Sequence, residues 1–428
     1  MKDIFKTILQ EFQERSLPEL LPRPYHLPEN DQIQTLIGLR RVGKTYLLYQ
    51  KIQELILQGV PKETILFINF EDERLLNLKA EHLYLLLEAY YELHPENTSK
   101  KLYLFFDEIH AAPSWNLFLK RLYEQKNLHI YITGSSSKLL SSELATELRG
   151  RTQAHHVYPL SFSEFLKFKR FEPGKNIAYS QRRFTLKKLL TEYLEYGGYP
   201  DVARLDNPLE KEAILRNYLD LIIYKDIVDR YKIRNTVLLK NLMKYVVTNI
   251  SKQLSLNAFY ELMKKDSLVS KDTVGEYFSY LEEIGFVYQI TKYSPSLKKQ
   301  FNAPKKTYIA DNGFKKIYGM NFSDDAGRIL ENMVCLELKR QEKELYYVKE
   351  KYECDFIVKE GKRITQAIQT CFELNTENTE RELLGLHHAM TTLQIQKGII
   401  LTFDQEKQLT EGKKTIHVIP VWKWLQLS

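Results

Sequence analysis

The sequence predicts an α/β protein that begins with a three-layer domain, in which a parallel sheet lies between two layers of helices. Four short apolar runs, rich in β-branched and aromatic residues, are typical of buried strands. Helical segments with apolar residues at three- and four-residue spacing alternate with these runs, as in parallel sheets. The predicted strands are 33–37, 64–70, 102–106 and 128–133, and the predicted helices are 46–57, 82–93 and 115–125.

Length and composition limit the class of protein. A chain of 428 residues is too long for one hydrophobic core and predicts two to four domains. It has no apolar run that could cross a bilayer and no secretory signal, so we expect a cytoplasmic protein without a membrane partner. The net charge of +7 permits a nucleic-acid partner without requiring one. The cysteines lack the spacing of a zinc site or a disulfide framework, and they are Cys335, Cys354 and Cys371.

The segment between the first strand and the first helix reads G-x-x-x-x-G-K-T, which is the pattern of a phosphate-binding loop. Backbone N–H groups of such a loop surround phosphates at the N-terminus of a helix. We therefore expect a nucleoside triphosphate, ATP first, with Lys44 on the β- and γ-phosphates and the Thr45 hydroxyl on Mg²⁺. The predicted nucleotide-binding residues are Gly38, Leu39, Arg40, Arg41, Val42, Gly43, Lys44 and Thr45.

The third predicted strand ends in two acids, Asp107 and Glu108. An apolar strand followed by Asp-Glu is the form of a Walker B element. Asp107 would bind Mg²⁺, directly or through water, and Glu108 would orient and polarise the water that attacks the γ-phosphate. A solvated acidic strand end is the alternative, and the preceding phosphate-binding loop argues against it.

Two further residues are candidates for contact with the γ-phosphate. Ser135 follows the fourth predicted strand at the edge where parallel sheets bind ligands, and it is a candidate sensor. Alternatively, the serines at 135–137 cap the next helix. Arg151 is a candidate catalytic arginine, acting in its own chain or on a neighbouring subunit, which would require a homo-oligomer. The alternative for Arg151 is a surface ion pair.

These motifs together resemble a widespread family of bacterial and archaeal AAA+ superfamily ATPases, which join a motor domain to a C-terminal domain of unknown function. The resemblance covers nearly the whole chain, and it implies ATP binding at 38–45, Mg²⁺ at Thr45 and Asp107, and hydrolysis at Glu108. The segments that carry it are 38–45, 70–75, 106–109, 133–136, 150–151, 159–165 and 196–200.

The middle of the chain predicts a helical lid followed by a winged helix. Helices are expected over 209–231 and 237–250, and a helix, a capped helix and a strand follow over 256–290, with Ser270 as the cap. The second of these helices carries acids that disfavour DNA, namely Glu276, Glu282 and Glu283. The next segment is basic, and it is either a DNA contact or a solvated hairpin. The candidate DNA-binding residues are Lys292, Lys298, Lys299, Lys305 and Lys306.

The last hundred residues resemble the PD-(D/E)XK nuclease fold in the order of their elements. Glu331 lies on a predicted helix and Asp355 on a predicted strand, as two of the acids of such a site would. The resemblance also implies a further acid and a lysine on the next strand, but Gln369 and Cys371 stand at these positions. A glutamine offers only a neutral carbonyl and a thiol cannot replace an ammonium, so we expect no nuclease activity.

Three parts follow from these patterns: an ATPase domain with its leader at 1–200, a helical lid and winged-helix region at 201–320, and a nuclease-like domain at 321–428. We expect an ATP hydrolase whose motor acts on an attached winged-helix and nuclease-like module, with DNA as the candidate target. The alternative is a nucleotide-dependent switch or scaffold that signals to a protein partner.

Overall fold

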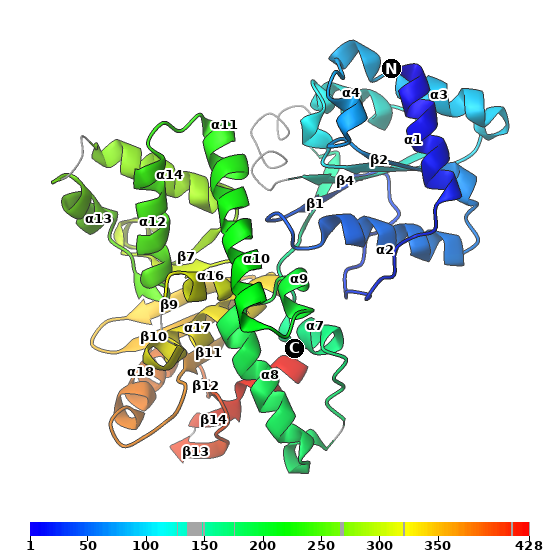
Figure 1. The fold of residues 1–428 in the computed structure, drawn as a ribbon. Coiled ribbons are helices and arrows are strands. Elements are labelled where there is room, and N and C mark those ends of the chain that lie inside the picture. Colours follow the sequence, from blue (N-terminus) through cyan, green and yellow to red (C-terminus); the bar gives the residue numbers. More distant parts are fainter. Residues whose placement is uncertain are drawn as a thin grey trace. The chain divides into compact units, whose positions relative to one another are not determined.

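The structure is a computed structural model that describes residues 1–125, 127–134, 148, 150–174, 176–265, 269–319, 322–411 and 414–427. The candidate sensor Ser135 lies outside these residues. Contacts within the chain separate two compact units, residues 1–157 and residues 158–428 (Figure 1). The predicted division into three parts, 1–200, 201–320 and 321–428, stays a prediction.

The first unit is built on a five-stranded sheet in the order β2-β3-β4-β1-β5, and every neighbouring pair is parallel. Four of the strands are those that the apolar runs predict. The fifth, β5, reads Thr-Gln-Ala-His-His and lies partly exposed at the edge of the sheet, so no apolar pattern marks it. The strands are β1 (Ile33–Ile37), β2 (Ile65–Asn69), β3 (Leu102–Asp107), β4 (Leu128–Gly134) and β5 (Thr152–His156).

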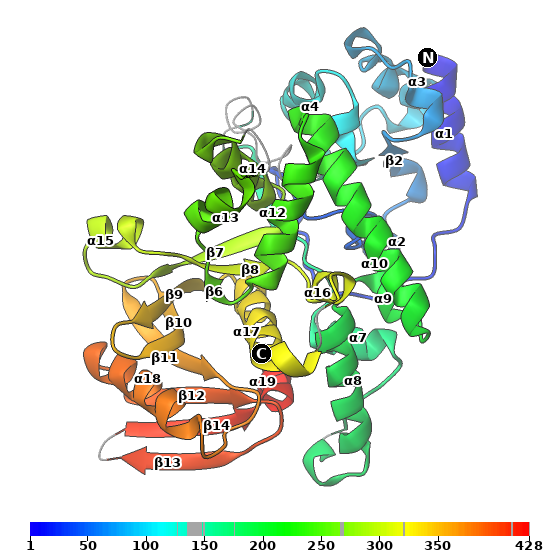
Figure 2. The ribbon, with the colours of Figure 1, turned by 60° about the vertical axis from the view of Figure 1, so that its left-hand side comes forward.

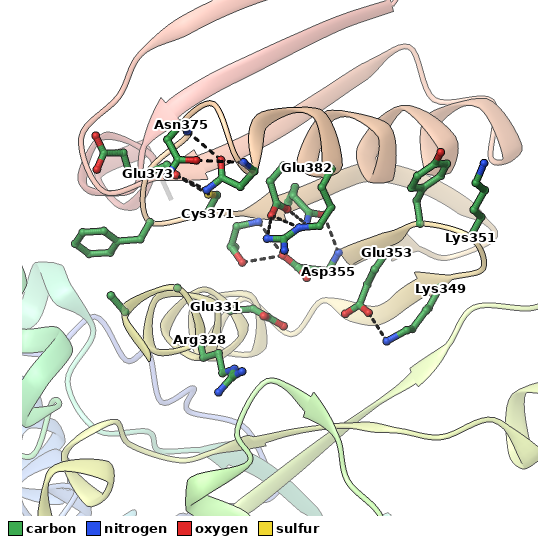
Figure 3. Close-up of a pocket in the computed structure, with 18 of the residues that line it drawn as sticks. Arg328, Glu331, Lys349, Lys351, Glu353, Asp355, Cys371, Glu373, Asn375 and Glu382 are labelled. Atoms are coloured by element: carbon green, nitrogen blue, oxygen red, sulfur yellow. Dashed lines mark hydrogen bonds and ion pairs between the residues drawn. The ribbon is translucent and has the colours of Figure 1, made fainter. Parts of the chain in front are cut away.

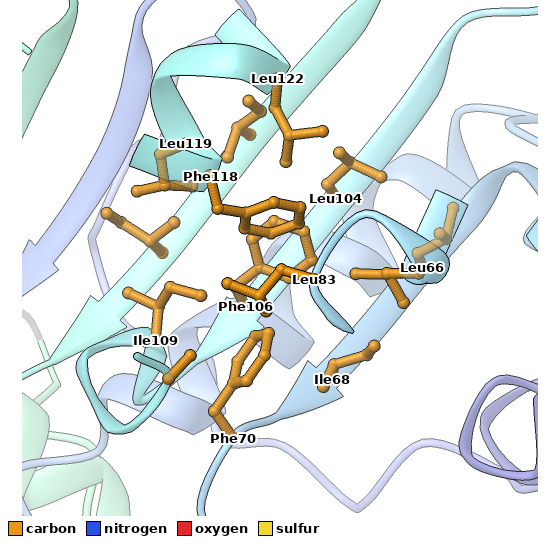
Figure 4. Packing of buried hydrophobic residues seen from close by; sticks show 14 of the residues in the cluster. Leu66, Ile68, Phe70, Leu83, Leu104, Phe106, Ile109, Phe118, Leu119 and Leu122 are labelled. Carbon is orange, nitrogen blue, oxygen red and sulfur yellow. The ribbon is translucent and has the colours of Figure 1, made fainter. Parts of the chain in front are cut away.

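Helices cover both faces of this sheet and complete the three layers (Figure 1). Leu66, Ile68, Leu104 and Phe106 point from β2 and β3 to one face, where they pack with residues of α3 and α4 (Figure 4). Helix α2 lies on the opposite face, as Figure 1 shows. The helices are α1 (Lys2–Glu14), α2 (Lys44–Leu57), α3 (Leu85–Leu93) and α4 (Trp115–Tyr123). The predicted α/β architecture of this domain is therefore confirmed.

The second unit begins with helices. A π-helical turn, Ile222–Val228, continues α10 into α11, so the segment predicted as one helix over 209–231 is one rod with an irregular centre. The helices are α7 (Phe162–Phe168), α8 (Arg182–Tyr196), α9 (Pro200–Ala203), α10 (Pro208–Leu221), α11 (Asp229–Tyr231), α12 (Thr236–Thr248), α13 (Leu256–Met263), α14 (Lys271–Glu283), α15 (Leu297–Asn302), α16 (Gly313–Ile317), α17 (Phe322–Arg340), α18 (Thr379–Thr392) and α19 (Val421–Leu427).

One nine-stranded sheet runs through this unit in the order β13-β14-β12-β11-β10-β9-β7-β8-β6 (Figure 2). Strand β7 pairs with β9 in parallel, through Thr291 with Tyr346 and Lys292 with Tyr347, so the sheet continues across residue 320. The strands are β6 (Lys252–Gln253), β7 (Val287–Lys292), β8 (Lys306–Ile309), β9 (Glu344–Lys349), β10 (Glu353–Glu360), β11 (Arg363–Thr370), β12 (Lys397–Thr402), β13 (Lys407–Glu411) and β14 (Lys414–Pro420).

Asp311, the second residue after β8, joins two segments of this unit. Its carboxylate accepts hydrogen bonds from the backbone N–H groups of Gly198, at 2.7 Å, and Gly313, at 2.8 Å. A Cβ on Gly197 would lie 1.7 Å from Asp311 Oδ1, so only glycine fits there. Burial raises the pKa of Asp311 to about 7, although the two N–H groups act to lower it.

The raised pKa of Asp311 predicts how stability depends on pH. Between about pH 4 and pH 7 the unfolded carboxyl is ionised while the folded one keeps its proton, so the free energy of unfolding falls by at most about 1.4 kcal/mol per pH unit. Asp311→Asn removes this slope. Thermal melting of both proteins should be followed from pH 4.5 to 8. The melting temperature of the variant should rise relative to that of the wild type up to about pH 7, and the difference should then stay constant. A constant difference across this range would contradict the prediction.

Candidate functional site

The phosphate-binding loop leaves the sheet at the end of β1, between β4 and β5. Its two glycines have different physical roles. A Cβ on Gly38 would lie 2.2 Å from the carbonyl oxygen of Val157, so the chain passes too closely for any side chain. Gly43 has a φ of 97°, in the left-handed region that glycine tolerates, and it starts α2. Both positions therefore shape the loop before any ligand binds.

Lys44 lies over the backbone of its own loop. Its side chain is 4% exposed, and its Nζ donates to the carbonyl oxygens of Gly38 and Leu39, both at 3.1 Å. Nζ also lies 3.7 Å from Glu108 Oε1. The ammonium is thus held at the centre of the loop by weak neutral acceptors, which phosphate oxygens can replace with stronger charge-assisted hydrogen bonds.

Asp107 connects the loop with two strands. The Thr45 hydroxyl donates to Asp107 Oδ2 at 2.8 Å, and the Thr133 hydroxyl of β4 donates to Oδ1 at 2.6 Å. Burial is the main cause that raises the pKa of Asp107 to about 6; the charge of Glu108 adds to it, and the two hydroxyls oppose it. A hydroxyl and a carboxylate are oxygen donors of the kind that Mg²⁺ prefers, so Thr45 and Asp107 fit the predicted metal.

Glu108 lies between two nitrogen groups. Its Oε2 is 3.2 Å from His110 Nδ1, on the side away from Lys44, and its own side chain is 13% exposed. The backbone of Glu108 is left-handed, with φ 49° and ψ 42°, and its N–H donates to the Thr133 hydroxyl at 2.9 Å. Strain at a non-glycine residue of this kind is typical of functional sites. No sequence pattern singled out His110 or Thr133.

Arg23, in the leader before β1, is a further residue that the sequence patterns did not assign to the site. It is 6% exposed, and its Nη1 donates to the carbonyl oxygen of Val42 at 2.7 Å. The segment that carries it is tied to α2, since the backbone of Arg23 exchanges hydrogen bonds with the Gln50 side chain at 2.9 and 3.0 Å. The leader therefore supports the loop from outside the motif.

The predicted arginines lie in different places. Arg40 forms an ion pair with Glu71 at 3.0 Å, and Arg41 is exposed, with a φ of 66°. The backbone carbonyl of Arg151 accepts from Ile33 at the start of β1, whereas the loop follows the end of that strand. The Arg151 guanidinium lies 5.2 Å from the centre of the Tyr123 ring and 4.0 Å from Glu124. Arg151 thus lies near the start of β1, at the other end of this strand from the loop. Its role as a catalytic arginine, in its own chain or on a neighbouring subunit, stays a prediction.

A second concentration of buried charge lies in the unit 158–428, around a cavity of about 670 Å³ between α17, the β9–β10 turn, the ends of β10 and β11, and α18 (Figure 3). Glu331, Asp355 and Glu382 point toward one another in it. Gln369 donates to Glu382 Oε2 at 2.5 Å and accepts from the backbone N–H of Asp355 at 3.2 Å. Cys371, also on its wall, has its pKa raised to about 11, mainly by burial, and is no substitute for an ammonium.

Lys306 is the one predicted DNA-binding residue that the structure removes from the surface. Its side chain is 2% exposed and pairs with Glu331, Glu353 and Asp355, so the prediction that it contacts DNA is wrong. The sequence pattern failed because β8 carries this lysine into the interior, where only the fold brings acids to it. Lys298 and Lys299 are exposed, Lys305 is partly exposed, and Lys292 lies 3.5 Å from Glu350.

The sheet order, the loop and the Asp107 contacts together define a P-loop ATPase domain. A family model described as an AAA domain matches residues 30–166, and a domain of unknown function, DUF8612, matches residues 187–321. The predicted ATPase class is confirmed by this match, whereas the nuclease-like and winged-helix predictions have no such support.

Two relatives match over most of their length. The chain is 36% identical over 407 residues to uncharacterized protein MJ1544 of Methanocaldococcus jannaschii, covering 92% of this chain and 88% of that one. It is 33% identical over 361 residues to an uncharacterized protein of Haemophilus influenzae, with 83% and 86% covered. The chain belongs to the family of these proteins.

Solved structures are less similar. The Walker-type ATPase PABY2304 of Pyrococcus abyssi aligns with a TM-score of 0.43 at 13% identity, covering 75% of this chain and 96% of that one. The Aeropyrum pernix ORC1 protein, solved in complex with DNA, aligns with a TM-score of 0.33 at 12% identity, with 74% and 91% covered. Likenesses at this level carry no argument about function. Within the described part of the chain, no helix has the length and apolar character needed to cross a membrane.

Proposed function

We propose that the chain is a Mg²⁺-dependent ATP hydrolase. The observation that carries the proposal is the convergence of Lys44, Thr45, Asp107 and Glu108, which the contacts above join into one cluster at the carboxyl edge of the sheet. Lys44 binds the β- and γ-phosphates, and Thr45 and Asp107 hold the metal ion. When bound, Mg²⁺ supplies positive charge that offsets the charge developing on the phosphates. Glu108 polarises the attacking water.

Nucleotide binding would rearrange this cluster in a defined way. Lys44 would exchange its two loop carbonyls for phosphate oxygens, and Thr45 would offer its hydroxyl oxygen to the metal ion. The 3.7 Å approach of Lys44 to Glu108 then weakens, because the ammonium is satisfied by phosphate. Glu108 keeps its neighbour His110, which is 3.2 Å away and does not belong to the loop. His110 is therefore a positioning residue for the carboxylate that activates water.

The region that follows α12 supports a role on DNA. The support comes from the connection between β7 and β8 rather than from helix α14. After α12 the elements run β6, α13, α14, β7 and β8, and β8 lies antiparallel between β6 and β7, which is the arrangement expected of a winged helix. Helix α15 lies in the connection from β7 to β8 and carries the exposed Lys298 and Lys299 (Figure 2). We place the candidate DNA contact there, since phosphate contacts require exposed cations.

A nucleotide-dependent switch that signals to a protein partner is the second candidate. The observation that favours it is the acidic character of α14, which carries Glu276, Glu282 and Glu283 and is ill suited to phosphate. Both candidates share the same nucleotide site. They differ in whether DNA changes the rate of hydrolysis.

Glu108→Gln tests the assignment of the hydrolytic carboxylate. The amide cannot polarise water, so we expect steady-state ATP turnover to fall by about 100-fold or more, while Mg-ATP affinity, measured by titration calorimetry, stays unchanged. Glu124→Gln, at the exposed glutamate that ends α4 beside Arg151, is the matched control and should keep full activity. Turnover that survives in Glu108→Gln would overturn the assignment.

His110 variants test whether this histidine positions Glu108. His110→Leu should lower kcat by about 10-fold or more without raising KM for ATP, because a misplaced carboxylate affects the reaction rather than binding. His110→Asn places an amide near the Nδ1 position and should recover much of the rate. His94→Leu is the control, since His94 also neighbours a glutamate, Glu96, at 3.6 Å, but outside the cluster. Equal kcat values in wild type and His110→Leu would contradict the role.

ATP turnover with and without duplex DNA separates the two candidate functions. If DNA is the target, it should stimulate turnover, and the Lys298→Ala/Lys299→Ala variant should lower the slope of log affinity against log salt by about 2. Lys100→Ala/Lys101→Ala, a pair of exposed lysines in the first unit, should leave the slope unchanged. The switch would be favoured if DNA does not change the rate of ATP turnover and does not bind in a fluorescence anisotropy titration.

A further inference from the structure

The buried Lys306 is surrounded by three carboxylates from two elements. Its Nζ lies 2.9 Å from Glu331 Oε1 on α17, 2.7 Å from Glu353 Oε1 and 2.9 Å from Asp355 Oδ1, both on β10. A lysine ammonium has three N–H groups, and each can be directed at one of these acceptors. All three N–H groups of the Lys306 ammonium can therefore have a carboxylate acceptor.

The ammonium lies at the point where carboxylates from two elements converge. Glu331 and Asp355 line the cavity from opposite sides (Figure 3). Both accept from Lys306 Nζ at 2.9 Å. The distances from nitrogen to oxygen are those of charge-assisted hydrogen bonds, and a divalent ion would bind at the same point of convergence.

The remaining acceptors of the cavity are also engaged. Asp355 Oδ2 accepts from the Thr370 backbone N–H at 2.9 Å and from the Thr370 hydroxyl at 2.8 Å. Glu382 accepts from Gln369 on one oxygen and from Arg381, at 3.0 Å, on the other. Within the described residues, no group of three or more histidines, cysteines and acids is arranged to hold a metal ion. The carboxylates that a metal would need are thus already paired.

The electrostatics of the cluster keep Lys306 charged. Burial alone would lower its pKa, but the charges of Asp355, Glu331 and Glu353 outweigh burial and raise the pKa well above the usual range. Burial and the charge of Asp355 raise the pKa of Glu331, whereas the Lys306 ammonium opposes this rise and favours the carboxylate form. A metal ion at this point of convergence would have to displace the Lys306 ammonium, whose side chain is 2% exposed.

We infer that Lys306 is the resident cation of the carboxylate cluster beside this cavity and takes the place of a divalent metal ion. The C-terminal region is then a metal-independent module whose acids serve to hold β8, β10 and α17 together. As they stand, the three carboxylates form no metal site, so they would have to move together to bind a divalent cation once the ammonium is removed. This inference does not depend on ATP hydrolysis.

Mn²⁺ binding to the full-length chain tests the inference directly. All variants carry Asp107→Asn, so that the nucleotide site does not contribute, and no nucleotide is added. Electron paramagnetic resonance should detect no Mn²⁺ bound to the Asp107→Asn chain. Bound Mn²⁺ that disappears when Asp355→Asn is added would overturn the inference, and this arm needs no substitution of Lys306.

The variant Lys306→Gln provides a second test of the inference. Without metal its melting temperature should fall, because three carboxylates lose their counter-ion; Mn²⁺ at about 100 times its Kd should then raise it by about 5 °C. Adding Asp355→Asn should abolish the Mn²⁺ response. Lys315→Gln is the matched control, since Lys315 is also 2% exposed but pairs with one carboxylate, Asp325, at 2.9 Å. A folded Lys306→Gln that binds no Mn²⁺ would show that the ammonium does not occupy a cation position.

Discussion

The contacts of Asp107 are the interaction on which the nucleotide site depends. One carboxylate accepts from Thr45 at the start of α2 and from Thr133 on β4, while its own backbone belongs to β3. Thr133 in turn accepts from the backbone N–H of Glu108, so the two acids are oriented by one hydroxyl. The pKa of Asp107, raised to about 6, reflects how much burial this arrangement requires. The phosphate-binding loop, Asp107 and Glu108 are thereby held together by contacts within the protein.

Two buried lysines in this protein, Lys44 and Lys306, differ in the charge of their partners. Lys44 is paired with neutral carbonyls and lies 3.7 Å from one carboxylate, so a phosphate can compete for it. Lys306 is paired with three carboxylates at 2.7 to 2.9 Å, and no ligand offers a better exchange. Burial strengthens both sets of contacts, because little water screens them. The number of charged partners therefore distinguishes a lysine that can bind a ligand from one that holds the fold.

Local pattern was sufficient for much of the fold. Apolar runs predicted β1 to β4, and the helix, the strand and the next strand predicted at Glu331, Asp355 and Gln369 correspond to α17, β10 and β11. It was insufficient for β5, whose polar residues lie at the edge of a sheet, and for β6, a strand of two residues. It also gave no sign that β7 pairs with β9 and so continues one sheet across residue 320, because strand pairing is a long-range property.

The sequence also indicated only some of the residues of the nucleotide site. The motif residues Gly38 to Thr45, Asp107 and Glu108 could be assigned from spacing, because a phosphate-binding loop is a local structure and a Walker B acid follows its strand directly. His110, Thr133 and Arg23 belong to the cluster only through contacts that the folded chain creates. Lys306 was misplaced because the role of a charged side chain depends on its neighbours, and these come from distant segments. Local chemistry thus specifies where the phosphates bind, whereas tertiary packing decides which charges reach them and which are held in the interior.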